Sequence, residues 1–321
     1  MSHTQSAPCQ PPLSLLEWLD QHGWKPVRDR GGDEVAGLCP LHQETHPSFY
    51  VNRRKQVFYC HGCGRGGGLA QLQQLLDRFP LPAADDGTRP PYLDVAYRFY
   101  QRQLLQYDHA RAYLARRGIH DWAVIDGMRI GYAPGACLCR YLEQRGYAGS
   151  ALRESGLVDE RGRDWFFRSI TFPLPSANNL YGRSLSNGIG RHRFLPGCKG
   201  GLYRWAETVA FPRVIVVEGL FDVAALWQAG FPNTVCALGS YLNPVQLSQL
   251  CRSGGPSIYI CFDADPNGSG QRAARRLSIQ LLHAGVESRR VELPTPYDPA
   301  SFFAAGGAAS AFQRCLDRAR P

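Results

Sequence analysis

Two aspartates separated by one residue follow a short apolar run in the C-terminal third of the chain. The run is IYICF, residues 258–262, and the aspartates are Asp263 and Asp265. A loop of sequence PNGSG, residues 266–270, comes next. Carboxylates at this spacing can bind calcium, can hold magnesium for catalysis, or can simply form a turn, because Asp tolerates sharp bends.

Three further acidic residues have a comparable place in the sequence. Glu218 ends the apolar run RVIVVEG, Asp222 starts a helical segment, and Asp298 comes after another strand-like segment. The carboxyl ends of parallel strands share one sheet edge, where open α/β sheets bind ligands. Carboxylates gathered there repel one another unless cations lie among them. The pattern predicts a magnesium site completed by substrate phosphates, with these ligands: Glu218, Asp222, Asp263, Asp265 and Asp298.

The calcium alternative conflicts with the sequence around Asp263. DADPNG matches the start of an EF-hand loop, but such a loop ends in a bidentate Glu, and the corresponding residue here is Ala274. An EF-hand is also entered from a helix, whereas this loop follows β-branched and aromatic residues. A turn explains one aspartate but not several at matching strand ends. Magnesium, or manganese in its place, is the expected catalytic cation.

A second group of candidate metal ligands lies near the N-terminus. Cys39 and His42 form a Cys-x2-His pair, Cys60 and Cys63 form a Cys-x2-Cys pair, and residues 43–59 separate them. Two close pairs joined by a hairpin-length segment are what a tetrahedral zinc site requires. We expect a structural zinc ion, because four protein ligands leave no open position for catalysis and a domain this small has little core.

Two further histidines compete as zinc ligands on spacing alone. His61 lies between the cysteines of the second pair and His46 is spaced further from the first cysteine, so neither is assigned. Aromatic and basic residues alternate between the pairs, which suits stacking and phosphate contact on single-stranded nucleic acid. We expect Phe49 and Phe58 instead to pack the ribbon.

The composition is typical of a soluble globular protein with an anionic partner. The 321 residues carry a net charge of +9, and 44% of them are hydrophobic. No apolar run is long enough to span a membrane and no signal-peptide pattern begins the chain, so a cytoplasmic protein without a membrane partner is expected. In that compartment the eleven cysteines are expected as metal ligands or buried thiols.

Breaks in composition divide the chain into four segments. We expect a zinc-binding domain over residues 1–79, with a disordered tail over 1–12, and a Pro-rich linker over 80–91. Residues 92–210 begin with helical periodicity and continue as a basic subdomain of short strands. In residues 211–321, apolar runs alternate with helical segments, which predicts a parallel sheet flanked by helices. The expected fold class is α/β with α+β parts.

The chain resembles the bacterial DnaG-type DNA primases over about residues 13–315. The zinc-ligand spacing, VEGLFDVAAL, CFDAD and YDPASFF occur in the order of that family, and residues 110–134 resemble its entry into the catalytic core. The acidic half resembles a TOPRIM domain, which topoisomerases and some nucleases share, and the preceding zinc ribbon narrows the resemblance to primases. The resemblance implies that the acidic residues hold metal ions around the nucleotide.

The resemblance also implies a basic stretch beside the active site. LYGRSL and HRFLPGCKGGLYRW match it, so Arg183, Arg193 and Lys199 are expected to grip template backbone or incoming triphosphate. In departures from the family pattern, the loop after Asp265 is longer, Thr295 stands where a further Asp is common, and a proline, residue 196, replaces a usual polar residue. A looser hold on one metal is the expected consequence of Thr295.

A DNA primase is the function that the resemblance implies, that is, a nucleotidyltransferase that copies single-stranded DNA into a short RNA primer from NTPs. The helicase-binding domain of chromosomal primases is not seen, which favours a short form from a phage, plasmid or integrated element. A replicative helicase or a single-strand-binding protein is a candidate partner. Two alternatives stay open: a zinc-dependent single-stranded-DNA-binding protein with an inactive TOPRIM core, and a TOPRIM nuclease.

Overall fold

The chain forms two compact units, Met1–Arg78 and Phe79–Pro321. Within the described residues, no helix is long and apolar enough to cross a membrane. The expected tail and the predicted ligands His42 and Cys63 lie outside those residues. The computed structural model describes residues 14–21, 24, 26–29, 32–41, 47–61, 65–77, 91–186, 192–197, 199–251 and 255–321.

The first unit is an antiparallel sheet with a helix before it and a helix after it in sequence. Side chains from both helices pack with the sheet residues Phe49 and Phe58, whose rings stack with centroids 5.1 Å apart. The prediction that these two aromatics pack the ribbon is confirmed. The elements are α1 (Leu15–Gln21), β1 (Arg28–Asp29), β2 (Glu34–Gly37), β3 (Phe49–Asn52), β4 (Val57–Cys60), β5 (Gly66–Gly68) and α2 (Leu69–Asp77), with the strands paired in sequence order.

The second unit begins with helices around a second antiparallel sheet, ordered β6-β7-β8-β9. Its first helix starts at Pro91, where the fixed φ of proline suits a first helical residue, so the expected linker reaches one residue too far. The rest of that linker lies outside the described residues. The elements are α3 (Pro91–Gln106), α4 (Asp108–Arg116), α5 (Trp122–Gly127), β6 (Gly131–Ala133), α6 (Leu138–Glu143), α7 (Gly149–Glu154), β7 (Ser169–Leu174), β8 (Asn179–Ser184), β9 (His192–Phe194) and α8 (Trp205–Thr208).

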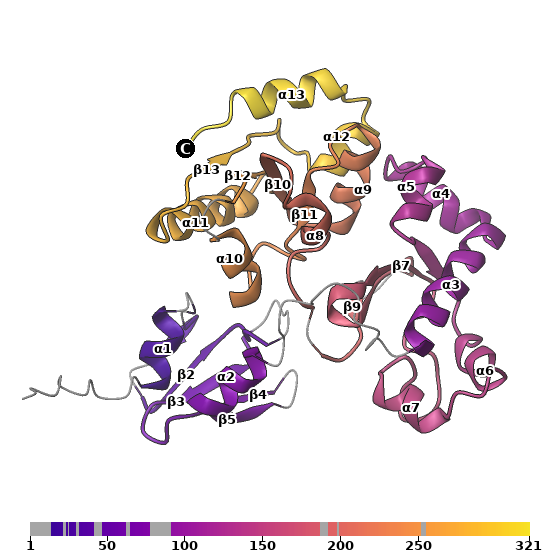
Figure 1. Cartoon of the computed structure of the whole chain (residues 1–321), viewed down its shortest axis with the longest axis horizontal. Helices are drawn as coiled ribbons and strands as arrows, with labels where there is room; N and C mark the ends of the chain where they lie inside the picture. Colours follow the sequence, from indigo (N-terminus) through magenta and orange to yellow (C-terminus); the bar gives the residue numbers. More distant parts are fainter. Residues whose placement is uncertain are drawn as a thin grey trace, which may run out of the picture. The chain divides into compact units, whose positions relative to one another are not determined.

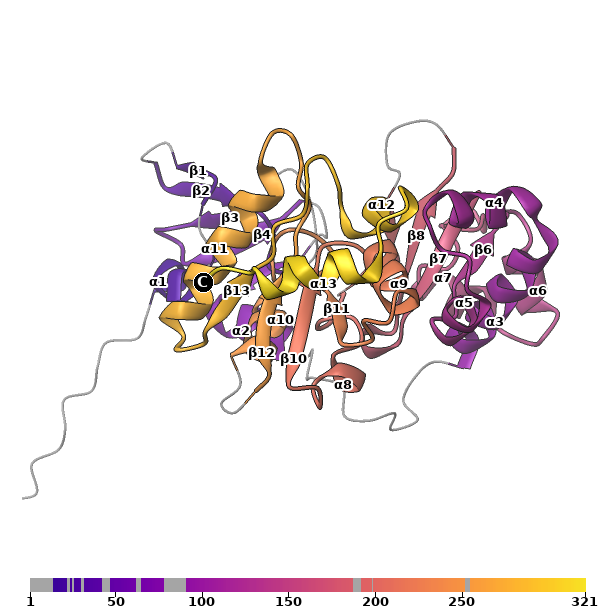
Figure 2. The same cartoon turned by 90° about the horizontal axis from the view of Figure 1, so that it is seen from above.

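The C-terminal part of this unit is the predicted parallel sheet, ordered β11-β10-β12-β13. β10 and β11 are buried on both faces, as parallel strands between helix layers require. Val214 and Val216 face α10 and α11, whereas Ile215 and Val217 face α9, α12 and α13. Figures 1 and 2 show α13 and α11 on opposite sides of the sheet. The elements are β10 (Arg213–Val217), α9 (Leu220–Gln228), β11 (Thr234–Cys236), α10 (Pro244–Leu250), β12 (Ser257–Ile260), α11 (Ser269–His283), β13 (Ser288–Arg290), α12 (Pro299–Ala304) and α13 (Ala309–Asp317).

One hydrophobic core joins the two sheets of the second unit. Phe172 of β7 meets Phe221 of α9 edge to face, with ring centroids 5.1 Å apart, and Tyr113 of α4 also contacts Phe221. Aromatic pairs in this geometry add stability beyond their buried area. The shared core holds α4 and β8 in a defined position relative to the carboxyl ends of β10 and β12.

Candidate active site

Five carboxylates gather where the parallel strands end. Glu218 follows β10 directly, and Asp263 and Asp265 come shortly after β12, its neighbour in the sheet. Asp222 lies in the first turn of α9, and Asp298 is the N-cap of α12. The Asp263 backbone N–H donates a hydrogen bond to Glu218 Oε1 at 3.2 Å, which ties the two strand ends together.

Asp222 is buried, and backbone groups bond to both of its carboxylate oxygens. The Gly219 N–H donates to Oδ2 at 3.1 Å, and the Ala300 N–H donates to Oδ1 at 3.0 Å. Burial, with the charges of Asp298 and Asp263, raises the pKa of Asp222 well above its usual value. Through these two hydrogen bonds, Asp222 links the start of α9 to the start of α12.

Asp263 has the donor chemistry that a hard cation needs. Its Oδ1 is buried and has no hydrogen-bond partner among the described residues. Burial, together with the charges of Glu218, Asp298 and Asp265, raises the pKa of Asp263 to about 7. Burial also raises the pKa of Glu218, against the opposing hydrogen bond from the Asp263 N–H. A divalent cation beside these oxygens would favour their ionised forms.

The residues present fit magnesium better than a cation that needs a full protein cage. In the parts of the chain that the structure describes, no three Asp, Glu, His or Cys side chains are arranged to hold one ion between them. Magnesium typically takes one or two carboxylates and fills its other positions with water and substrate phosphate. Glu218 and Asp263, joined at the two strand ends, offer such a partial set.

Arg117 is a site residue that the sequence did not reveal. It follows α4, and its Nη2 lies 3.8 Å from Asp298 Oδ2. Nothing in ARAYLARRG distinguishes this arginine from its neighbour Arg116, because the contact depends on how α4 packs on α9. What marks Arg117 as a site residue is its positive charge among carboxylates that repel one another, and this arrangement exists only in the folded structure.

The predicted loop PNGSG, residues 266–270, is shorter in the structure, because α11 already begins at Ser269. Gly268 has a φ of 69°, in the left-handed region that favours glycine. The Ser269 hydroxyl donates to Asp265 Oδ2 at 2.6 Å. A Cβ on Gly270 would lie 2.1 Å from the backbone oxygen of Asp263, so the first turn of α11 packs closely on the strand end. The start of α11 therefore packs against the backbone of Asp263.

The three predicted basic residues do not share one face. Lys199 is buried, and its charge acts on Cys236, whose thiol donates to the Glu218 carbonyl oxygen at 3.1 Å. Arg183 lies on the face of β8 that holds Tyr181 and contacts His192 of β9. Tyr181 belongs to the core shared with the carboxylate edge.

Arg193 lies on the other face of that sheet. Strand side chains alternate between faces, and Arg193 pairs with the residue next to Arg183. Its guanidinium lies 5.6 Å from the Trp165 ring centroid, and Nη1 donates to the Trp165 oxygen at 3.4 Å. The structure therefore places Arg183 on the face of the sheet that packs into the core shared with the carboxylate edge, and Arg193 on the opposite face.

The first unit places two of the predicted zinc ligands in its core. Cys39 and Cys60 are both buried. The Leu41 N–H points to Cys39 Sγ at 3.3 Å, and the Ser48 hydroxyl lies 3.2 Å from Cys60 Sγ. The Leu41 N–H, as a donor to sulfur, would stabilise the thiolate of Cys39, the form that binds metal. This donor chemistry fits zinc, and the remaining predicted ligands lie outside the described residues.

Comparisons with known proteins match both regions. A family model described as a CHC2 zinc finger of DnaG matches residues 27–80, and a Toprim-like model matches residues 215–303. A structure of the zinc-binding and RNA polymerase domains of the Aquifex aeolicus primase is similar with a TM-score of 0.63 at 26% identity, covering 96% of this chain and 83% of that one. A DnaG catalytic domain bound to single-stranded DNA gives a TM-score of 0.60 at 26% identity, covering 72% and 80%.

Curated relatives extend the similarity beyond the two matched regions. The DNA primase of Treponema pallidum is 30% identical over 319 residues, which cover 85% of this chain and 52% of the relative. The chain thus spans about half the length of this relative and of a Synechocystis DNA primase that it also matches. The matches and the fold agree: over its zinc-ribbon and TOPRIM-containing portion, the chain is similar in sequence and in structure to the DnaG-type primases.

Proposed function

We propose that this protein is a DNA primase, which synthesises short RNA primers on single-stranded DNA. The observation that carries the proposal is the meeting of Glu218 and Asp263 at adjacent strand ends. A relative of the same fold has been solved with single-stranded DNA, which supports a DNA template. The basic net charge of +9 is in keeping with such a partner.

In this mechanism Glu218 and Asp263 would hold magnesium or manganese, with Asp265 and Asp298 in the surrounding shell. The bound cation would neutralise phosphate charge and help ionise the attacking hydroxyl. Lys199 and Arg183 would bind phosphates of nucleotide or template, and Asp222 would keep α9 and α12 in place. The primer 3′-hydroxyl oxygen would bond to the α-phosphorus of the incoming NTP. The bond from this phosphorus to the oxygen that bridges it to the β-phosphate would break, so that pyrophosphate leaves. The hydroxyl proton would pass to water.

The first unit would serve as a zinc ribbon that holds template. Cys39, His42, Cys60 and Cys63 are the proposed zinc ligands. In support, Cys39 and Cys60 are buried with polar groups beside their sulfurs. A zinc ion with four protein ligands stabilises a small fold and takes no part in chemistry.

A primer-synthesis assay tests the proposal. The full chain is incubated with single-stranded DNA, labelled NTPs and Mg²⁺ or Mn²⁺. We expect RNA primers from the wild type and from Asp317→Ala, whose carboxylate is exposed on α13, but none from Asp263→Ala. DNA binding without synthesis under either metal contradicts the proposal and favours a binding protein. Cleavage of the template would identify a nuclease.

A further inference from the structure

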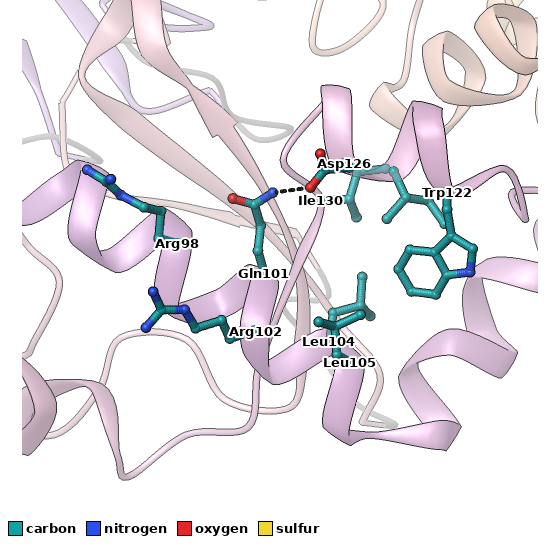
Figure 3. Close-up of a pocket in the computed structure, with 9 residues that line it drawn as sticks. Arg98, Gln101, Arg102, Leu104, Leu105, Trp122, Asp126 and Ile130 are labelled. Carbon is teal, nitrogen blue, oxygen red and sulfur yellow. Dashed lines mark hydrogen bonds between the residues drawn. The ribbon is translucent and has the colours of Figure 1, made fainter.

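A hollow of about 260 Å³ lies between α3 and α5, and none of the five carboxylates lines it. Leu104, Ile125 and Ile130 form its buried floor. Leu105 and Trp122, at its rim, are 60% and 47% exposed. Figure 3 shows Leu104, Leu105, Trp122 and Ile130 around one open space. Single exposed apolar side chains are common, whereas here two large ones lie beside one hollow with an apolar floor.

A second hollow continues along α3 and is rich in arginine. It shares Arg98 and Arg102 with the first and is also lined by Tyr141 and Arg145. Arg145 lies over the Tyr141 ring, 3.7 Å from its centroid, and Arg102 Nη1 donates to the Tyr141 hydroxyl at 3.4 Å. We call the two hollows together the α3 groove.

The arginine end of the α3 groove keeps unneutralised positive charge. Arg98 pairs with Asp94, which also accepts from Arg129 at 2.6 Å. Neither Arg102 nor Arg145 forms an ion pair with any residue that the structure describes. Their contacts with Tyr141 orient both guanidinium groups without cancelling their charge, which leaves them available for carboxylates.

We propose that the α3 groove binds an acidic peptide segment of a partner protein, with a bulky apolar side chain of that segment seated between Leu105 and Trp122. A cavity of about 150 Å³ can hold a benzene molecule, and pockets for drug-sized ligands begin near 300 Å³. The apolar hollow, at about 260 Å³, therefore suits one large side chain. Carboxylates next to that side chain would reach Arg102 and Arg145, the usual manner in which arginine clusters recognise acidic motifs.

Charge distribution separates a peptide from a nucleic acid strand as the occupant. Asp126 lines the apolar end, where its Oδ1 accepts from Gln101 Nε2 at 3.3 Å (Figure 3). A nucleic acid strand carries a negative charge at every phosphate, so one of its phosphates would be repelled by the Asp126 carboxylate. A peptide can instead carry its acidic residues only at the arginine end of the groove. A second copy of the chain would bring the same arginines together in a two-fold interface, which like charges oppose.

A direct binding measurement tests this proposal with the full chain. The probe is a fluorescein-labelled peptide, Gly-Ser-Asp-Asp-Glu-Asp-Gly-Leu-Phe, followed by anisotropy and by Trp fluorescence. We expect Arg102→Glu and Trp122→Ala each to weaken binding by about tenfold or more. Arg161→Glu makes the same charge change at an exposed turn outside the groove and should bind like the wild type. A peptide with Asn and Gln in place of the acidic residues should bind more weakly. Added salt should weaken the binding of the acidic peptide.

Several outcomes would overturn the proposal. These are no anisotropy change with wild type at millimolar protein, equal weakening by Arg161→Glu, or a concentration-dependent dimer that Trp122→Ala abolishes. A dT10 oligonucleotide whose binding Arg102→Glu removes while peptide binding persists would assign the groove to nucleic acid. The groove variants should keep their thermal stability and template-dependent primer synthesis, so this test stands apart from that of the carboxylates.

Discussion

The guanidinium of Arg117, just after α4, is built into the acidic edge beside Asp298, the N-cap of α12. It also lies over the ring of Phe221, 5.2 Å from the centroid. Its charge opposes the burial that raises the pKa of Asp222 and Asp263. One cation from the antiparallel half of the unit thus partly offsets the repulsion among carboxylates of the parallel half.

Removing this cation should destabilise the second unit and weaken catalysis. We expect Arg117→Ala to cost about 1–2 kcal/mol, between the values for exposed and buried ion pairs. Arg116→Ala, which removes an exposed arginine over Tyr113, is the matched control and should change little. Thermal unfolding and primer yield measure both effects. Equal behaviour of the two variants would show that the contact with Asp298 has no role.

Replacing Asp263 should stabilise the metal-free protein while it abolishes activity. The pKa of Asp263 is raised from 3.8 to about 7, so the folded state holds a proton that the unfolded state releases in that range. This contribution to stability is complete below pH 3.8 and is lost as pH rises towards 7. Asp263→Asn carries no charge, so at pH 8 without metal it should melt above the wild type, by roughly 2–4 °C per kcal/mol.

Magnesium provides the complementary comparison for this variant. Added Mg²⁺ should raise the melting temperature of the wild type, because binding to the folded state alone stabilises it. The same addition should have less effect on Asp263→Asn. A variant that melts below the wild type in EDTA at pH 8 would contradict the assigned burial of this charge.

The strand ends were predictable because apolar runs stop where acidic residues begin. That pattern located Glu218, Asp263 and Asp265, and the alternation of strands and helices predicted the parallel sheet. Arg117 was not predictable, since only the packing of α4 on α9 separates it from Arg116. The register between β8 and β9 decides on which face of the sheet Arg193 lies. The sequence between the two strands does not specify that register.

The backbone contacts of Asp222 could likewise be known only from the fold. Asp222 matched a metal-ligand position, but the N–H that satisfies its Oδ1 comes from Ala300, far along the chain. Such a long-range hydrogen bond leaves no periodic trace in the sequence. The resemblance indicated which residues meet at the edge, and the structure indicates what each one contacts there.

Gly270→Ala should destabilise the protein even though Ala favours helices by about 1 kcal/mol. The added Cβ would lie 2.1 Å from the Asp263 backbone oxygen, so α11 or the strand end must move, at a cost of about 1–3 kcal/mol. Gly127→Ala, which meets nothing within 4 Å at the end of α5, is the control and should be neutral or stabilising. Denaturant unfolding of both variants measures the difference, and similar midpoints would disprove the close packing.

Arg183 and Arg193 should differ in their effects on template binding. Arg183→Ala should weaken binding of single-stranded DNA and reduce the salt dependence of the binding constant by about one charge. Arg193→Ala, which faces Trp165 on the other side of the sheet, should change that slope less. Binding constants over a range of salt concentrations provide the measurement. A larger change in slope for Arg193→Ala would place the template path on the opposite face of the sheet.

Loss of one zinc ligand should unfold the first unit and leave the second intact. Cys60→Ser should reduce the zinc content, because a structural zinc site contributes on the order of 10 kcal/mol to a small domain. Cys251→Ser, at a half-buried cysteine of the second unit, is the control and should retain the metal. Zinc per chain by mass spectrometry and limited proteolysis of residues 14–77 measure the two effects. If Cys60→Ser keeps the wild-type zinc content, Cys60 is not a ligand and the four-residue assignment fails.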